Sequence, residues 1–334
     1  RTSQSLKDDS KIDADEQEPC LHPTPDCCTP FLWSGRCGRV PMLNRQKTML
    51  YLLDCCEGGL SRLHLVKIAF LLRHESCLQQ ERTFYDFVPY RYGPFSFALY
   101  RDMELLAAKG FVAWLEDRAE AARATTAEVR RVAGSLSDNV CQAVRRFARE
   151  YARTPEERLL RDVYARYPWF ASRSERDALR PPSARPARAA APAIYTIGYQ
   201  GLSVDAFFDR LLRSGIRQIM DVRRNPISRK YGFAKKSMSE IARRLDLSYR
   251  HVPELGIASA SRRHLSGYES YRRLLDGYER ELARSHEGDL ARLSEEMGRR
   301  PTALVCMEAD AAWCHRGRLA GALACRTGLE IVHL

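Results

Sequence analysis

Residue types suited to chemistry gather close to the C-terminus of this 334-residue chain, in the run 305–316. Cys306 and Glu308 lie two residues apart at the end of an apolar segment, so on a strand they point to the same face. Three polar residues then begin a segment with helical periodicity: Cys314, His315 and Arg316. A thiolate at a helix N-terminus beside His and Arg has a lowered pKa, and a nearby carboxylate can orient a base. This pattern predicts a catalytic group of Cys306, Glu308, Cys314 and His315.

Two expectations concern the cysteines of this run. Cys314 is the expected nucleophile, with Cys306 as the alternative, because unpaired helix amides and cationic neighbours favour the thiolate. Cys325 lies on the apolar side of the same helix and should be buried and inert. Two Cys, one His and one Glu are also acceptable zinc ligands. Since Cys-x-Glu followed by Cys-His matches no metal-ligand spacing, we expect no metal and no other cofactor.

A second polar run, residues 221–236, follows another apolar segment. Its first residue, Asp221, stands at the expected strand end and joins the predicted catalytic group. Six basic residues follow: Arg223, Arg224, Arg229, Lys230, Lys235 and Lys236. Arginine matches phosphate oxygens in bidentate geometry and lysine adds a point charge, while Tyr231 and Phe233 are placed to stack on a base. The residues expected to bind substrate are therefore Arg223, Arg224, Asn225 and Arg229, together with Arg316.

Two further residues complete the predicted substrate-binding set. Tyr199 lies in the turn 198–201, whose two glycines permit close approach of a ligand, and the helix that follows attracts anions at its N-terminus. His251 begins the run 251–256 at the end of the third expected strand. Both residues are placed to reach the same edge of a sheet.

The elements that must position these residues alternate along the chain. Strands are expected at 194–197, 216–222, 249–252, 303–307 and 331–334. Helices are expected at 204–212, 237–245, 268–284, 287–298 and 315–324. This alternation predicts an α/β domain with a mainly parallel sheet, in which ligands bind at the carboxyl ends of the strands. We expect the ends of the second and fourth strands to face one cleft, bringing Asp221 near Glu308.

Four motifs of this part of the chain resemble one known family. They are Tyr-Thr-Ile-Gly-Tyr from residue 195, Asp-Val-Arg-Arg-Asn-Pro from 221, His-Val-Pro-Glu-Leu-Gly from 251, and the Cys306-x-Glu308 to Cys314-His315-Arg316 element. In this order, over about 140 residues, they resemble domain-of-unknown-function family 488. The resemblance implies an α/β fold and an active site, and names no reaction.

Residues 42–170 have helical periodicity with a turn signal at Gly93-Pro94. Ser96 is the expected N-cap of a helix that ends near residue 109, and a strand is expected at 111–115. Helices should follow at 125–151 and 154–167. The order predicts a mostly helical, winged-helix-like domain, and the aromatic-Gly-Pro segment resembles the helical domain found in many prophage and antitoxin proteins.

Composition divides the chain further. Residues 171–192 are rich in Pro, Arg, Ser and Ala, which predicts a solvated linker, easy proteolysis there and two separately folding halves, the second being 193–334. Residues 1–41 carry four cysteines without periodicity or a Cys-x2-Cys pair. We expect this segment to be a disordered extension, or one foreign to the natural protein.

The net charge of +12 and the sequence pI near 9.3 favour polyanionic partners: a nucleic acid or a phosphorylated small molecule. Eleven cysteines, an odd number in a long chain, do not form the pattern of a small secreted disulfide protein. With no apolar run of about 18 residues and no secretory signal, we expect a cytoplasmic protein without a membrane partner.

Two functions follow from these patterns. The first is an enzyme that processes nucleic acid or nucleotides with a Cys/Glu/His/Arg site, in DNA repair or phage defence. The alternative is a non-catalytic, nucleic-acid-binding regulator of the antitoxin type, for which a winged-helix-like domain and positive charge suffice. Loss of function in a Glu308→Gln variant that still binds would favour the enzyme.

Overall fold

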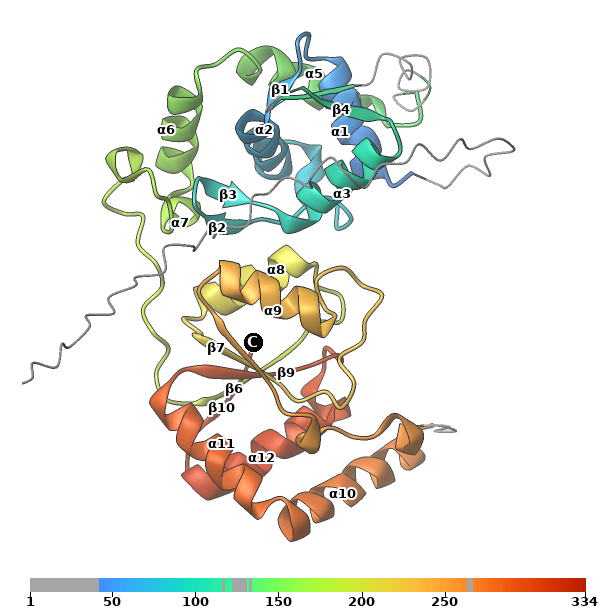
Figure 1. Cartoon of the computed structure of the whole chain (residues 1–334), viewed down its shortest axis with the longest axis vertical. Helices are drawn as coiled ribbons and strands as arrows, with labels where there is room; N and C mark the ends of the chain where they lie inside the picture. The colour runs from blue at the N-terminus through green and yellow to red at the C-terminus, as the bar shows by residue number, and fades with distance from the viewer. Residues whose placement is uncertain (1–41, 116–117, 122–130, 132–133, 263–266) are drawn as a thin grey trace, which may run out of the picture. The chain divides into compact units, whose positions relative to one another are not determined.

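A five-stranded parallel sheet forms the centre of the C-terminal part of the computed structural model (Figure 1). The structure describes residues 42–115, 118–121, 131, 134–262 and 267–334, so the expectations for residues 1–41 lie outside it. Residues 42–334 form one compact unit. Within the described residues, no helix has the length and apolar character needed to cross a membrane.

The N-terminal part of the described chain combines helices with two small antiparallel sheets. Its elements are α1 (Asn44–Asp54), β1 (Leu60–Ser61), α2 (Arg62–Glu75), η2 (Cys77–Gln80), β2 (Val88–Tyr90), β3 (Gly93–Phe95), α3 (Phe97–Ala108), β4 (Val112–Leu115), β5 (Arg118–Ala121), α5 (Asp138–Tyr151), α6 (Glu156–Arg166) and α7 (Pro168–Ala171). Strands β1, β5 and β4 form one sheet in that order, and β2 pairs with β3 in a hairpin. The helical character and the strand near 111–115 are confirmed.

Local signals in this part act as the sequence predicts, with one exception. The hydroxyl of Ser96 accepts a hydrogen bond from the Leu99 amide and caps α3. The predicted helix 125–151 is wrong in its extent, because the described residues 134–137 form a turn before α5. Gly134 and its serine neighbours break the helical pattern there, and Ser137 stands at the N-cap.

The C-terminal part alternates strands and helices. Its elements are η4 (Asp177–Leu179), β6 (Ile194–Gly198), α8 (Val204–Arg213), β7 (Gln218–Asp221), α9 (Lys235–Arg244), β8 (Ser248–His251), η5 (Pro253–Leu255), η6 (Ser259–Arg262), α10 (Tyr268–Ser285), α11 (Glu287–Arg299), β9 (Thr302–Cys306), η7 (Ala311–Trp313), α12 (His315–Thr327) and β10 (Ile331–His333). The strand order in the sheet is β10-β6-β9-β7-β8, with every pair parallel. The predicted α/β architecture is confirmed.

Helices cover both faces of this sheet (Figure 1). One core layer joins the sheet to α8 and α9, and Ile219 of β7 points into it. The other joins the sheet to α10, α11 and α12, and the next residue, Met220, points into that one. This alternation is the period of two that a strand imposes, so β7 is buried on both sides. The polar residues that follow the strands are therefore held by rigid elements.

Hydrogen bonds connect α8 with the N-terminal part. The buried carboxylate of Asp205 accepts from the amides of Phe97 and Ala98 and from the Ser96 hydroxyl, at 2.7, 3.1 and 3.0 Å. It thus satisfies backbone donors at the start of α3 that the helix itself cannot satisfy. Phe97 also packs in the core layer beside α8 and α9. The separate folding of the two halves stays a prediction. The contacts of Asp205 and Phe97 argue against it, because separate halves would lose them.

Candidate functional site

Two neighbouring strands bring the main predicted motifs together. Strand β7 pairs with β9, and in their register Asp221 lies opposite Val305. The carboxyl ends of the two strands therefore meet at one edge of the sheet, as the sequence predicts. At this edge, the end of β9, the loop after it and the start of α12 supply the reactive side chains.

Cys306, Cys314 and His315 form a buried cluster. Their ligand-type atoms, the two Sγ atoms and a ring nitrogen, all lie within 4.8 Å of one another. His315 Nδ1 is 3.7 Å from Cys306 Sγ and 3.9 Å from Cys314 Sγ. Cys306 also donates to Glu308 Oε2 at 3.2 Å. The structure thus unites the four residues predicted at the end of β9 and the start of α12.

The tautomer of His315 follows from its other contact. Its Nε2 lies 2.9 Å from the backbone carbonyl oxygen of Val222, and a carbonyl can only accept, so Nε2 carries the hydrogen. In the neutral ring Nδ1 then presents a lone pair toward the two sulfurs. Tyr278 of α10 closes the far side with its ring centroid 5.5 Å from the imidazole. The histidine is fixed in both orientation and proton position.

The two thiols differ in acidity. Burial opposes ionisation of Cys314, but its interactions with the Cys306 thiol and the His315 ring outweigh it and lower the pKa of Cys314 to about 6. The hydrogen bond to Cys314 and burial hold the pKa of Cys306 well above its usual value. Cys306 is therefore the proton donor of the pair and Cys314 the acceptor.

The exposure of the cysteine side chains contradicts part of the prediction. Cys314 and Cys306 are each 1% exposed, whereas Cys325 is exposed. The prediction of a buried Cys325 is wrong, because the residue lies on the face of α12 opposite Leu319 and Leu323, which pack in the core.

Asp221 and Arg223 form a buried ion pair at the end of β7. Arg223 donates to both carboxylate oxygens of Asp221, at 2.8 and 2.6 Å, and the Tyr249 hydroxyl donates to the carboxylate at 2.7 Å. The guanidinium also donates to the Tyr199 hydroxyl and to the carbonyl oxygen of Phe233. Because these partners surround both charges, the pair holds the loop after β7 in place.

Arg316 has a comparable structural position. Its side chain is 1% exposed, and its two terminal nitrogens donate to the backbone oxygens of Glu308 and Ala309, at 2.5 and 2.8 Å. Nε of the same side chain is buried without a hydrogen-bond partner in the described structure. Arg316 therefore shapes the loop that carries Glu308, and its guanidinium faces protein rather than solvent.

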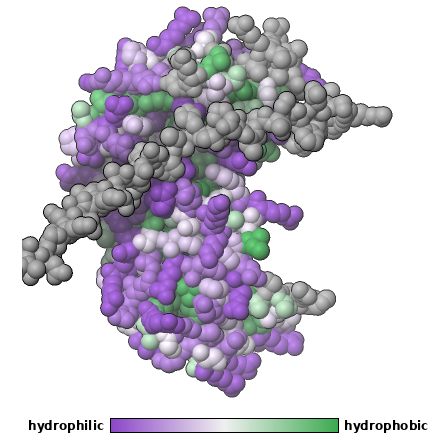
Figure 2. Space-filling view, in the orientation of Figure 1, coloured by the Kyte–Doolittle hydropathy of each residue, from purple (hydrophilic) through white to green (hydrophobic). Residues whose placement is uncertain are grey.

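The remaining predicted binding residues lie at or near the surface. Arg224, Asn225 and Arg229 are exposed in the loop between β7 and α9, and Arg224 donates to the carbonyl oxygen of Pro253. His251 is half-buried with Nε2 2.8 Å from the backbone oxygen of Arg223. Figure 2 shows a largely hydrophilic face with apolar side chains in separate patches.

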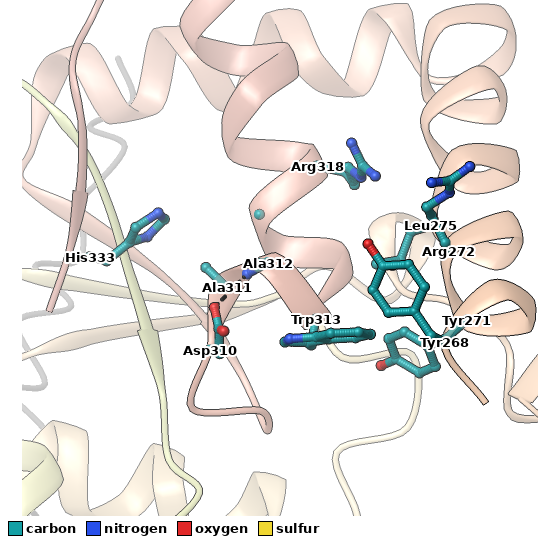
Figure 3. A pocket seen from close by; sticks show the side chains of 11 residues that line it. Tyr268, Tyr271, Arg272, Leu275, Asp310, Ala311, Ala312, Trp313, Arg318 and His333 are labelled. Atoms are coloured by element: carbon teal, nitrogen blue, oxygen red, sulfur yellow. Dashed lines mark hydrogen bonds between the residues drawn. The ribbon is translucent and has the colours of Figure 1, made fainter.

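A cavity of about 350 Å³ adjoins Glu308, and Trp313, Tyr268 and Tyr271 line it as well. These three aromatic residues also line a neighbouring cavity of about 620 Å³ together with Arg272 (Figure 3). The Tyr268 and Trp313 rings meet edge to face with centroids 5.1 Å apart, and 39% of Trp313 is exposed. We call this set of Tyr268, Tyr271, Arg272 and Trp313 the aromatic pocket.

Sequence reasoning did not find the aromatic pocket. None of the seven residues predicted to bind substrate lines either cavity. A signal was present: Tyr268, Tyr271 and Arg272 occupy one face of a helix at spacings of three and four, and Trp313 directly precedes Cys314. What the sequence lacked was any sign that the start of α10 approaches η7.

Gly198 explains how the loop after β9 comes so close to β6. A side-chain carbon at this position would lie 1.7 Å from the backbone oxygen of Glu308. Two backbone hydrogen bonds join the same segments. The Tyr199 amide donates to the Cys306 oxygen, and the Gln200 amide donates to the Met307 oxygen. The glycine is therefore required for the placement of Glu308.

The fold and the site define an α/β protein with a thiol, histidine and carboxylate cluster at the carboxyl edge of a parallel sheet. Residues 203–323 match the model of the family described as domain of unknown function DUF488. The family resemblance of the C-terminal half is confirmed. No curated protein matches the chain.

Proposed function

We propose that this protein is an enzyme that acts on a nucleotide or a nucleic acid, with its reactive centre at Cys306, Glu308, Cys314 and His315. One observation carries the proposal. Glu308 touches the buried thiol and histidine cluster on one side and lines the cavity of the aromatic pocket on the other. The reactive groups are thus next to a cavity that can bind a planar ring.

The aromatic pocket suits a nucleobase and its phosphate. Tyr268 and Trp313 present ring surfaces on which a base can stack, an interaction worth about 1–3 kcal/mol for each base. Arg272 is exposed at the rim and can pair with a phosphate. Arg318, on the other side, is already paired with Asp276 and Glu279. The positive net charge of the chain supports an anionic substrate.

Glu308 is the group that can exchange protons with a substrate, because it is half-buried and reaches the cavity. Cys306 and Cys314 are more deeply buried than Glu308. His315 lies beside both sulfurs and is held by its hydrogen bond to the Val222 oxygen. A carboxylate in this position can serve as general acid or base. DNA repair or phage defence is the setting we propose, with the reaction itself to be found by substrate screening.

The binding step can be tested with nucleoside monophosphates and a fluorescent single-stranded oligonucleotide, by calorimetry and anisotropy on the full chain. Trp313→Ala and Arg272→Ala should each weaken binding about tenfold. Arg299→Ala, which removes the same charge from an exposed site on α11, should not. Glu308→Gln should bind normally and turn over no substrate. Equal binding by all variants, or none by the wild type, would end the proposal.

One observation favours a regulatory function as the second candidate. The order α1-β1-α2-η2-β2-β3-α3-β4-β5, with a sheet of order β1-β5-β4, is compatible with a winged helix in which α3 would read DNA. However, Asp205 occupies the amides at the start of α3, the end that such helices present to bases. We therefore rank this function second. Duplex binding abolished by Arg101→Ala, with no effect of Trp313→Ala, would reverse the ranking.

A further inference from the structure

The cluster of Cys306, Cys314 and His315 has the dimensions of a metal site. A tetrahedral zinc ion holds sulfur at about 2.3 Å and a histidine nitrogen at about 2.0–2.1 Å, which places ligand S and N atoms roughly 3.6 Å apart. The two sulfur-to-Nδ1 distances here are 3.7 and 3.9 Å. All three ligand atoms lie within 4.8 Å of one another and are buried.

The surroundings of His315 also favour metal binding. Histidines that bind zinc donate their second ring N–H to a carbonyl or carboxylate, which fixes the tautomer and aims the free nitrogen at the metal. The hydrogen bond from Nε2 to the Val222 oxygen does this from the neighbouring strand end. The ring therefore offers Nδ1, and not a proton, to the space between the two sulfurs.

Glu308 stands outside this ligand set. Its carboxylate approaches Cys306 Sγ at 3.2 Å, yet it does not join the group whose ligand atoms are all mutually close. It is also the member of the cluster that lines the cavity. Structural zinc sites have four protein ligands, whereas catalytic ones have three and keep a position for water. Three buried ligands beside a carboxylate that reaches a cavity match the second pattern.

We propose that Cys306, Cys314 and His315 bind one zinc ion, with a water molecule as the fourth ligand beside Glu308. The two sulfurs are then ligands and not nucleophiles. Glu308 takes a proton from the bound water, and the resulting hydroxide forms the new bond to an electrophilic carbon or phosphorus atom of the substrate. The leaving group departs with the electrons of the broken bond and receives the proton from Glu308. This is hydrolysis, and it needs no further reactant.

This zinc site rests on the proposed function in one respect: it makes the enzyme a hydrolase. Metal binding itself does not require that a nucleotide is the substrate. The spacing that argued against a metal in the sequence is Cys-x7-Cys-His. That spacing is workable here because η7 and the loop held by Arg316 return the chain to the end of β9.

The test is the zinc content of the full chain, purified without a chelating resin and measured by plasma mass spectrometry. Cys306→Ser and Cys314→Ser should each hold one zinc equivalent less than the wild type. Cys325→Ser, which alters an exposed cysteine on the same α12, should hold the same amount as the wild type. Because the readout is a difference, zinc bound by the cysteines of residues 1–41 does not affect it. Equal zinc content in all four proteins would overturn the site.

Two further measurements complete the design. Glu308→Gln should keep its zinc; loss of one equivalent would place Glu308 among the ligands and overturn the open position. If the serine variants fail to fold by circular dichroism, alkylation of the wild type decides instead. Removal of zinc with EDTA should raise the alkylation rates of Cys306 and Cys314 and leave that of Cys325 unchanged, as peptide mass spectrometry would show. Unchanged rates at all three cysteines would also overturn the site, whatever nucleotide binding shows.

Discussion

His315 and Val222, 93 residues apart in the sequence, are joined by a hydrogen bond of 2.9 Å between Nε2 and the backbone oxygen. The bond connects the first turn of α12 with the end of β7. It decides which nitrogen of the ring faces the two thiols, and so makes the cluster suitable for a metal or for proton transfer. The loop after β7 therefore contributes to the site through a backbone oxygen.

The exposure of the cysteines predicts their order of reaction. In the native protein at neutral pH, iodoacetamide should label Cys325 and Cys77, both exposed, at least about tenfold faster than Cys314. A lowered pKa favours the thiolate of Cys314, but a side chain that is 1% exposed meets the reagent only in molecules whose cluster has opened. Peptide mass spectrometry over a time course measures the rates. Faster labelling of Cys314 would show that the cluster opens in solution.

The cap that Asp205 provides for α3 should contribute to stability. Asp205→Ala leaves the amides of Phe97 and Ala98 buried without an acceptor, and we expect a loss of about 2 kcal/mol or more in the free energy of unfolding. Glu104→Ala, on the exposed side of α3, should change it by less than about 0.5 kcal/mol. Urea unfolding of both variants compares them. Equal stability would mean that α3 is capped in another way.

Lys67 gives stability a specific dependence on pH. The side chain is buried, with Nζ 2.9 Å from the backbone oxygen of Pro94, and burial lowers its pKa to about 7 although Glu156 acts in the opposite direction. Between pH 7 and 10.5 the unfolded chain binds more protons at this site than the folded chain, so this group adds stability as pH rises, and the contribution is lost as pH falls through 7.

The free energy of unfolding of the wild type relative to Lys67→Met should therefore increase by about 2 kcal/mol between pH 7 and pH 9. Urea unfolding at the two pH values measures this change. Lys109→Met replaces an exposed lysine and serves as the control. If the difference between wild type and Lys67→Met is independent of pH, then the lysine is charged in the folded protein.

Much of the fold could be predicted from local patterns, because β6, β7 and β9 are short, buried runs that end at a polar motif. The cluster at Cys306 and Cys314 could be predicted as well, since its members are close in sequence. The partners of the charged residues could not be predicted from the sequence. The sequence shows that Arg223 and Arg316 are cationic, but only tertiary packing decides that both are buried against protein oxygens. The aromatic pocket was missed for the same reason.

Gly198 offers the sharpest test of how the site is held. In Gly198→Ala the new carbon would lie 1.7 Å from the backbone oxygen of Glu308, so the loop after β9 must move. We expect a loss of about 2 kcal/mol or more in the free energy of unfolding, together with loss of the zinc equivalent. Gly277→Ala is the matched control, because nothing lies within 4 Å of its new carbon in the middle of α10, and it should stabilise the protein by about 0.5–1 kcal/mol. Urea unfolding and metal analysis of the two variants give the answer. A Gly198→Ala protein with unchanged stability and metal content would mean that the approach of β6 to Glu308 does not position the site.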